Sequence, residues 1–275
     1  MENIKSALKM SNGVEIPVLG LGLWRVENEN ELRTSVKAAL DAGYVHIDTA
    51  SAYGNEDMVG RAVEDFGNRK EIFITTKLWN TDHLNVEASF EKSLKNLKTD
   101  YVDLYLIHWP APKFNNYVEA WKSVVKIYES GRAKAIGVSN FKRHHIEDIM
   151  NATGMAPHMN QVERHPDFQQ WDVFDYCETI GTKMTAYSPL GSGRLDALAN
   201  KVKPLTEKHK KTAAQIILRW HLQTGWVLIP KSVTPSRVLE NSRIYDFILD
   251  GADMDFMRAL DCGNKYLPDP DKADF

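Results

Sequence analysis

The chain has 275 residues, of which 43% are hydrophobic and 26% are charged, and its formal net charge at pH 7 is −3. This composition is typical of a soluble globular protein and excludes a disordered or fibrous chain, and the lack of a basic excess argues against binding to nucleic acid. No apolar run approaches the roughly eighteen residues of a membrane span, and the first residues lack the apolar core of a signal peptide, so we expect a cytoplasmic protein with no membrane partner. The two cysteines, Cys177 and Cys262, lie far apart in the chain, and we expect neither a disulfide framework nor a zinc site.

The chain begins with a predicted β-hairpin, because two short segments, 6–9 and 14–18, flank the turn Ser11-Asn12-Gly13. From residue 19 onward, short apolar runs alternate with segments of helical periodicity. The predicted strands are 19–24, 45–49, 72–78, 102–109, 133–139, 158–163, 183–188 and 226–231. The predicted helices are 31–42, 56–66, 86–97, 118–130, 146–153, 171–180, 205–223 and 235–245.

Strict alternation of strands and helices indicates parallel strands joined by crossover helices. Eight such units in a chain of this length predict one α/β domain over residues 1–275, a closed (β/α)8 TIM barrel with the hairpin before it and a short C-terminal tail after it. The alternative is an open, doubly wound sheet that binds a dinucleotide. Gly20-Leu21-Gly22 is followed by Arg25 where the dinucleotide fingerprint needs a third glycine, so that fingerprint is absent.

Reactive side chains stand at the C-terminal ends of the predicted strands, which is the end where TIM barrels carry their active sites. Asp48 ends the second strand, with Tyr53 just beyond it, Lys77 ends the third and His108 ends the fourth. Taken alone, each has an ordinary alternative, from a loop cap or a packed ring to a snorkelling lysine or a hydrogen-bonded core histidine. Their joint occurrence at one rim predicts a catalytic group.

The chemistry of these four side chains is complementary. A tyrosine with its ordinary pKa of about 10 is a poor proton donor at neutral pH, and a neighbouring ammonium lowers that pKa. Lys77 can supply the ammonium, Asp48 can pair with it, and His108 can donate a hydrogen bond to a carbonyl oxygen. We expect the group to protonate an oxygen on which negative charge develops. The group contains no obvious nucleophile and no metal-ligand cluster, so the electrons or the attacking group must come from elsewhere.

Aromatic side chains at the same rim predict a wall around a small ligand. Trp24, Trp79 and Trp109 follow the first, third and fourth strands, and core packing is the alternative for each of them. Tyr187, at the end of the seventh strand, offers a face for stacking on a flat ring, and the segment that it begins, 187–192, can contact a phosphate. An ordinary Ser-Pro turn is the alternative for this segment.

Polar side chains complete the predicted ligand site. Ser139, Asn140 and Gln161, at the ends of the fifth and sixth strands, suit a carboxamide, with loop capping as the alternative. After the eighth strand, Thr234 and Pro235 are a good N-cap and a good first residue for a helix, whose N-terminus attracts anions. Lys231 and Arg237 add positive charge there, where barrels commonly hold phosphate, although capping could be the only role. A flat amide-bearing ring, a diphosphate and one further phosphate together describe NADPH.

Several motifs occur along the chain in a characteristic order. They are Gly43-Tyr-Val-His-Ile-Asp-Thr-Ala-Ser-Ala-Tyr, Leu106-Ile-His-Trp-Pro, Gly137-Val-Ser-Asn-Phe, Asn160-Gln, Tyr187-Ser-Pro-Leu-Gly and Ile229-Pro-Lys-Ser-Val-Thr-Pro-Ser-Arg. Through these motifs the chain resembles the aldo-keto reductases over nearly its full length, and it looks most like short microbial and protozoan members such as 2,5-diketo-gluconate reductases and prostaglandin F synthases.

The resemblance implies reduction of aldehydes or ketones, with Tyr53 as the general acid, Asp48 and Lys77 tuning it, and His108 orienting the carbonyl group. It also implies that NADPH or NADP⁺ is the cofactor and that the substrate is a small carbonyl compound held near Trp24, Trp79 and Trp109. The residues that it places at the cofactor are Ser139, Asn140, Gln161, Tyr187, Ser188, Leu190, Lys231, Ser232, Val233, Thr234, Arg237, Glu240 and Asn241. We expect a monomer.

Three departures from the family pattern concern the ligand sites. Leu23 stands where many members have a threonine that can contact the cofactor, and the loop 111–116 and the tail 265–275 are short. The short segments predict an open substrate site. An NADPH-binding sensor or a structural barrel with little turnover is the alternative function, and the intact set of catalytic side chains argues against it.

Overall fold

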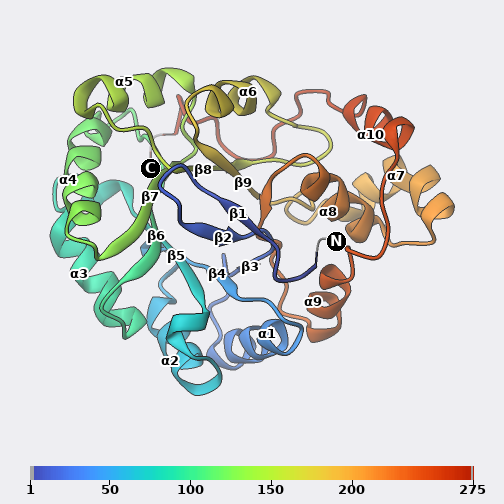
Figure 1. The fold of residues 1–275 in the computed structure, drawn as a ribbon, viewed down its shortest axis with the longest axis horizontal. Helices are drawn as coiled ribbons and strands as arrows, with labels where there is room; N and C mark the ends of the chain where they lie inside the picture. The colour runs from blue at the N-terminus through green and yellow to red at the C-terminus, as the bar shows by residue number, and fades with distance from the viewer. Residues whose placement is uncertain (1–2, 274) are drawn as a thin grey trace.

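The computed structural model describes residues 3–273 and 275, and its centre is a sheet of eight parallel strands that curls into a barrel (Figure 1). Neighbouring strands follow chain order from β3 to β10. The first and last strands meet through the bridges Leu19↔Leu228 and Gly22↔Lys231, which close the barrel. The strands are β3 (Leu21–Gly22), β4 (His46–Asp48), β5 (Phe73–Leu78), β6 (Val102–Ile107), β7 (Ala133–Ser139), β8 (Met159–Glu163), β9 (Lys183–Tyr187) and β10 (Val227–Leu228). The predicted (β/α)8 architecture is confirmed.

The two strands at the closure are shorter than predicted. The apolar runs 19–24 and 226–231 are reduced to the two-residue strands β3 and β10, because beyond them the two segments touch only through single bridges. Gly22 is needed at this junction: a Cβ at that position would lie 2.6 Å from the Ile229 carbonyl oxygen. Gly22 therefore permits a close approach of two backbones.

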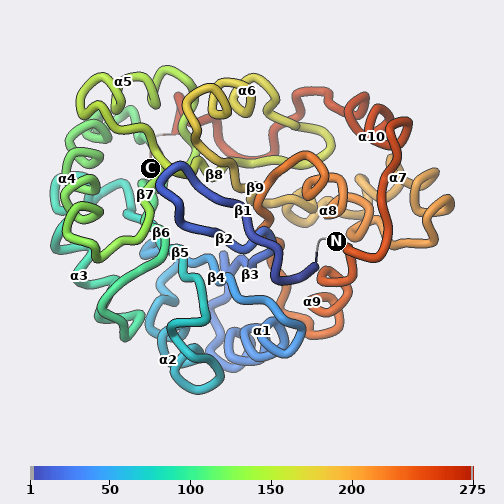
Figure 2. The backbone as a smooth tube through the Cα atoms, viewed as in Figure 1, coloured from blue at the N-terminus to red at the C-terminus, as the bar shows by residue number. Residues whose placement is uncertain are grey.

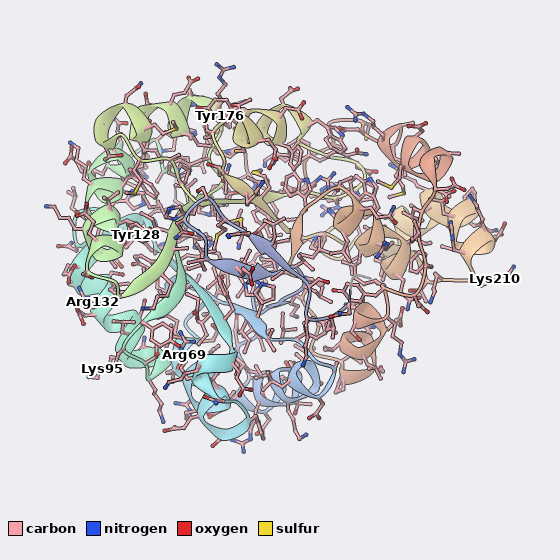
Figure 3. The ribbon with its side chains drawn as sticks, in the orientation of Figure 1. Arg69, Lys95, Tyr128, Arg132, Tyr176 and Lys210 are labelled. Atoms are coloured by element: carbon pink, nitrogen blue, oxygen red, sulfur yellow. The ribbon has the colours of Figure 1, made fainter. Side chains whose placement is uncertain are left out.

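Helices surround the barrel, and most turn an apolar face to the sheet, whereas the buried residues of α7 and α10 pack with α8 in a separate cluster. In α1, for example, Leu32, Val36 and Ala39 are buried. Figure 3 shows Lys95 and Lys210 at the periphery of the molecule, on the solvent side of this ring. The helices are α1 (Glu29–Asp41), α2 (Glu56–Phe66), α3 (Val86–Leu97), α4 (Tyr117–Glu129), α5 (Arg143–Thr153), α6 (Trp171–Thr179), α7 (Leu195–His209), α8 (Ala213–Gln223), α9 (Pro235–Ser242) and α10 (Gly251–Arg258). Among the described residues, no helix has the length and apolarity needed to cross a membrane.

The prediction of a single helix over 205–223 is wrong. Two helices occupy this region: α7 begins ten residues earlier, at Leu195, and ends at His209, and α8 begins at Ala213. The break follows from Lys210, whose φ of 54° is left-handed, and from Thr212, which caps α8 by accepting from the Gln215 backbone N–H. Helix α10 was not predicted, although Asp250 and Asp253 form a capping box at its start.

The predicted hairpin, β1 (Ala7–Lys9) and β2 (Glu15–Pro17), lies across the barrel in Figure 1. Its buried residues Met10 and Ile16 pack against Phe73 and Val227, which begin strands β5 and β10. The hairpin thus covers the N-terminal end of the barrel, and the opposite end carries the predicted site.

Candidate active site

Lys77 and Asp48 form a buried ion pair inside the barrel. The Lys77 Nζ lies 2.6 Å from Asp48 Oδ1 and also donates to the Thr49 carbonyl oxygen at 2.9 Å. The side chains are 0% and 2% exposed, so Lys77 is a buried ammonium and does not snorkel to the surface. Burial lowers the pKa of Lys77, and the carboxylate of Asp48 opposes that effect. The pair places one cation beside the C-terminal ends of β4 and β5.

Tyr53 stands next to this ion pair on a single 3₁₀ turn, η1 (Ser51–Tyr53). Its hydroxyl oxygen is 3.4 Å from Lys77 Nζ. The turn is held in place by Ser51, whose hydroxyl donates to the Lys77 carbonyl oxygen at 2.8 Å. Asp48, Tyr53 and Lys77, which are up to 29 residues apart in the chain, therefore meet at one point, as the sequence predicted.

The prediction that Lys77 lowers the pKa of Tyr53 is wrong for this structure. Burial, followed by the charge of Asp48 and the proximity of Tyr187, raises the pKa of Tyr53 well above its ordinary value. The main physical reason is the burial of the phenol. Asp48, which lies 2.6 Å from Lys77, adds to it because its charge offsets that of the ammonium, so the lowering by Lys77 is outweighed. Tyr53 is consequently a neutral phenol at pH 7.

His108 follows β6 and faces Tyr53 edge to face, with ring centroids 5.6 Å apart. Trp79 lies on another side of the imidazole, at 5.2 Å. Burial and the charge of Lys77 hold the pKa of His108 well below its ordinary value, so the ring is neutral and offers one N–H donor. Among the described residues, its Nδ1 atom is buried and has no hydrogen-bond partner.

The residues predicted to hold a carboxamide are hydrogen-bonded to one another and to the ion pair. Gln161 Nε2 donates to Asp48 Oδ2 at 2.7 Å, and Ser139 Oγ donates to the Gln161 carbonyl oxygen at 2.8 Å. Asn140 donates to the His108 carbonyl oxygen at 3.0 Å and accepts from the Tyr187 hydroxyl at 2.6 Å. The sequence did not predict the link from Gln161 to Asp48, because 113 residues separate them. These polar residues and the ion pair therefore form one connected hydrogen-bond network.

The predicted anion site lies around the start of α9. Lys231, Thr234 and Arg237 are exposed, and within residues 3–273 and 275 neither cation forms an ion pair. Thr234 occupies the N-cap position, but its side chain makes no capping hydrogen bond. Its backbone N–H donates instead to Ser232 Oγ at 3.1 Å. The Thr234 hydroxyl and two cationic groups are thus available at one helix N-terminus.

The remaining predicted cofactor residues surround this end of the barrel. Glu240 Oε1 accepts from the Thr212 hydroxyl at 2.6 Å and so joins α9 to the start of α8. Ser188 and Leu190 follow β9 and are partly buried, and Ser188 has a left-handed φ of 49°. Val233 is partly buried next to Ser232, and Asn241 is buried within α9.

The three predicted tryptophans have different neighbours in the structure. Trp79 and Trp109 are bridged by the ring of Phe275, at centroid distances of 5.8 and 5.2 Å. Trp24 is partly buried and lies under the guanidinium of Arg25, at 4.3 Å from ring centroid to Cζ. Phe275 was not predicted, because nothing in the local sequence shows where the C-terminal segment packs.

These observations describe a TIM barrel whose C-terminal rim holds a buried Asp–Lys pair, a neutral phenol and a neutral imidazole. The chain belongs to the Aldo/keto reductase family, whose sequence profile matches residues 18–261. It is accordingly an oxidoreductase that acts on carbonyl groups, and the resemblance inferred from the sequence is confirmed.

Relatives of known name are similar over the whole chain. Methylglyoxal reductase DkgA of Escherichia coli K12 is 45% identical, with 97% of this chain and 98% of the relative covered. Glyoxal reductase of Bacillus subtilis 168 is 46% identical, with 99% of each chain covered. A crystal structure of a Gox0644 mutant in complex with NADPH superimposes with a TM-score of 0.93 at 40% identity, covering 98% of this chain and 99% of that one.

Proposed function

We propose that the protein reduces aldehydes and ketones to alcohols with NADPH, and that Tyr53 delivers the proton. The observation that carries this proposal is the contact of the Tyr53 hydroxyl with Lys77 Nζ at 3.4 Å, beside the Lys77–Asp48 pair. NADPH, when bound, supplies the hydride from C4 of its nicotinamide ring. The groups of the protein bind and orient the two reactants and move the proton.

The raised pKa of Tyr53 keeps the phenol protonated at pH 7 but makes it a weaker acid, so proton transfer requires that the phenolate be stabilised as it forms. A phenol that stays protonated at pH 7 has a proton to give when negative charge develops on the carbonyl oxygen. Once the proton has left, the phenolate lies next to the Lys77 ammonium, which stabilises it. Lys77 therefore acts mainly after proton transfer begins, and Asp48 keeps the ammonium charged and fixed in position.

His108 is suited to orient the carbonyl group. Its depressed pKa keeps it neutral, so it can donate one hydrogen bond without competing with Tyr53 as a strong acid. Its ring stands edge to face with the Tyr53 ring, at 5.6 Å. A carbonyl oxygen placed between the two rings would accept from both donors.

The polar rim fits NADPH. Ser139, Asn140 and Gln161 offer amide and hydroxyl groups suited to a carboxamide. In this structure the Tyr187 hydroxyl donates a hydrogen bond to the Asn140 side-chain oxygen at 2.6 Å. We infer that a carboxamide replaces this hydroxyl and leaves the Tyr187 ring to stack on the nicotinamide. Lys231 and Arg237 suit a phosphate on the adenosine ribose, which favours NADPH over NADH.

Short α-dicarbonyl compounds are the first substrates to test, because two relatives are named as methylglyoxal and glyoxal reductases. Aromatic rings near His108 suit a small, planar molecule. The experiment measures NADPH consumption with a panel of aldehydes, α-dicarbonyls and quinones. Turnover with α-dicarbonyls supports the proposal. Tight NADPH binding without turnover on any compound would instead favour a sensor or a structural barrel.

A further inference from the structure

The C-terminal segment, described for residues 263–273 and 275, returns from α10 past α6 to the rim of the barrel (Figure 2). One attachment of the segment is Glu163, at the end of β8, whose side chain is 0% exposed. The carboxylate accepts from the Tyr266 N–H at 2.7 Å and from the Leu267 N–H at 3.2 Å, and Lys265 Nζ lies 3.2 Å away. This buried anion fixes the segment up to Leu267.

A second attachment, which we call the latch, joins Asp269 and Asp271 to Lys142 before α5. Lys142 Nζ lies 2.7 Å from Asp269 Oδ1 and 2.6 Å from Asp271 Oδ2. The other oxygen of Asp271 faces two imidazoles, with His144 Nε2 at 3.2 Å and His145 Nε2 at 3.4 Å. Beneath the latch lies a cavity of about 300 Å³ that is lined in part by Asn140, Lys142 and Asp269.

The histidines and Asp271 have the composition of a metal site, but their hydrogen bonding disfavours one. His145 Nδ1 accepts from the Lys142 backbone N–H at 3.2 Å, so a neutral ring carries its hydrogen on Nε2, the atom that faces Asp271. Burial lowers the pKa of His145 to about 4, so the ring is neutral at pH 7. A metal would need a lone pair on Nε2 and would lie near the Lys142 ammonium. The cluster is better explained as an attachment of the segment.

Beyond the latch, Phe275 contacts the two tryptophans near the catalytic group. Its ring stacks on Trp79, with centroids 5.8 Å apart and planes 5° apart, and meets Trp109 at 5.2 Å and 87°. Asn80 Nδ2 donates to the Phe275 carbonyl oxygen at 2.8 Å. Trp79 in turn contacts His108 at 5.2 Å. Phe275 is therefore one ring away from the imidazole that we propose orients the substrate.

We infer that Phe275 restricts the substrate site to small carbonyl compounds and that Asp269 and Asp271 are positioning residues that hold it there. This inference rests on the proposed carbonyl reduction. Four residues lead from Asp271 to Phe275, and a chain of that length reaches at most about 14 Å. The latched segment thus keeps the ring close to Trp79 and Trp109.

Without the latch, the nearest preceding attachment to a charged side chain is at Leu267, eight residues before Phe275, and the bond from Asn80 to the Phe275 carbonyl oxygen remains. Doubling the length of a flexible tether lowers the effective concentration of its end by about threefold. The loss of the latch should therefore weaken the coverage of the two tryptophans by about that factor. It should leave NADPH binding unchanged, because the latch does not contact the predicted anion site.

The test compares methylglyoxal with the bulkier 1-phenylpropane-1,2-dione. Phe275→Ala should raise the kcat/KM ratio of the bulky to the small substrate by about tenfold, the scale of two lost aromatic contacts. The double variant Asp269→Ala/Asp271→Ala should raise the same ratio by about threefold, with an unchanged Kd for NADPH. Asp246→Ala, which removes an exposed partner of Lys211 at 2.6 Å, is the matched control and should change neither quantity.

A double-mutant cycle distinguishes positioning from a general effect on stability. If the latch acts through Phe275, its removal has no further effect on the ratio in the Phe275→Ala background. An additive effect, or an unchanged ratio after removal of the latch, would overturn the inference. Hydrogen exchange gives a readout independent of turnover: backbone amides of residues 271–273 and 275 should exchange faster in the latch variant. Unchanged exchange would refute the latch even if the protein proved to have no reductase activity.

Discussion

Replacing Lys77 by Met separates the structural role of the buried ion pair from its chemical role. The substitution leaves the Asp48 carboxylate, 2% exposed, without its partner at 2.6 Å. Breaking a buried ion pair by removing one member costs about 3–5 kcal/mol, because the other charge remains desolvated. We expect the free energy of unfolding to fall by about this amount, measured by urea denaturation of the protein without cofactor.

The matched variant is Lys77→Met/Asp48→Asn, in which no charge is left unpaired. Gln161 can still donate to the remaining amide oxygen of residue 48, so most of the stability should return. Carbonyl reduction should not return, since no ammonium is present to stabilise the Tyr53 phenolate, and the loss should be about 10²–10⁴-fold in kcat. Recovery of both stability and activity in the double variant would refute the role given to Lys77.

Three further predictions concern pH, cofactor choice and the closure of the barrel. Because the pKa of Tyr53 is raised, its phenol remains protonated as the pH rises. The value of kcat/KM for reduction should therefore show no decrease caused by ionisation of Tyr53 below about pH 10. A decrease near pH 7 to 8 that is absent in Tyr53→Phe would contradict this prediction. Arg237→Ala should raise the Kd for NADPH at least about tenfold and leave that for NADH nearly unchanged, as a lost charge-assisted hydrogen bond predicts. Lys95→Ala, at an exposed position on α3, is the control and should change neither Kd. Gly22→Ala should lower the stability of the fold by about 1–3 kcal/mol, because the new Cβ would lie 2.6 Å from a backbone oxygen. Gly251→Ala is the control, because a Cβ there would have no neighbour within 4 Å, and it should leave the midpoint of thermal denaturation nearly unchanged.

Much of the fold could be predicted because the barrel repeats one local pattern. Each unit buries most of its strand and one face of its helix, and both periodicities are visible in the sequence. The error at 205–223 arose because two helices in succession keep the same apolar spacing. Only the capping pair Thr212 and Gln215 shows where the second helix begins.

The positions of the catalytic side chains could be predicted because they stand at strand ends, which a barrel brings to one rim. The electrostatics of these side chains could not be predicted from the sequence. The sequence shows that Lys77 lies near Tyr53 but not that Asp48 is close enough to compensate its charge, and burial then raises the pKa of the phenol. Contacts made by the C-terminal segment were also missed, because Phe275 and Trp79 are brought together by packing and not by any local pattern.

The central claim is that Tyr53 gives the proton, and single-turnover kinetics of Tyr53→Phe test it most directly. The variant keeps the ring and loses only the hydroxyl that lies 3.4 Å from Lys77 Nζ. Enzyme preloaded with NADPH is mixed with methylglyoxal, and the oxidation of NADPH is followed. We expect an unchanged Kd for NADPH and a rate of oxidation about 10²–10⁴-fold below that of the parent protein. Oxidation at the parent rate would show that another group delivers the proton.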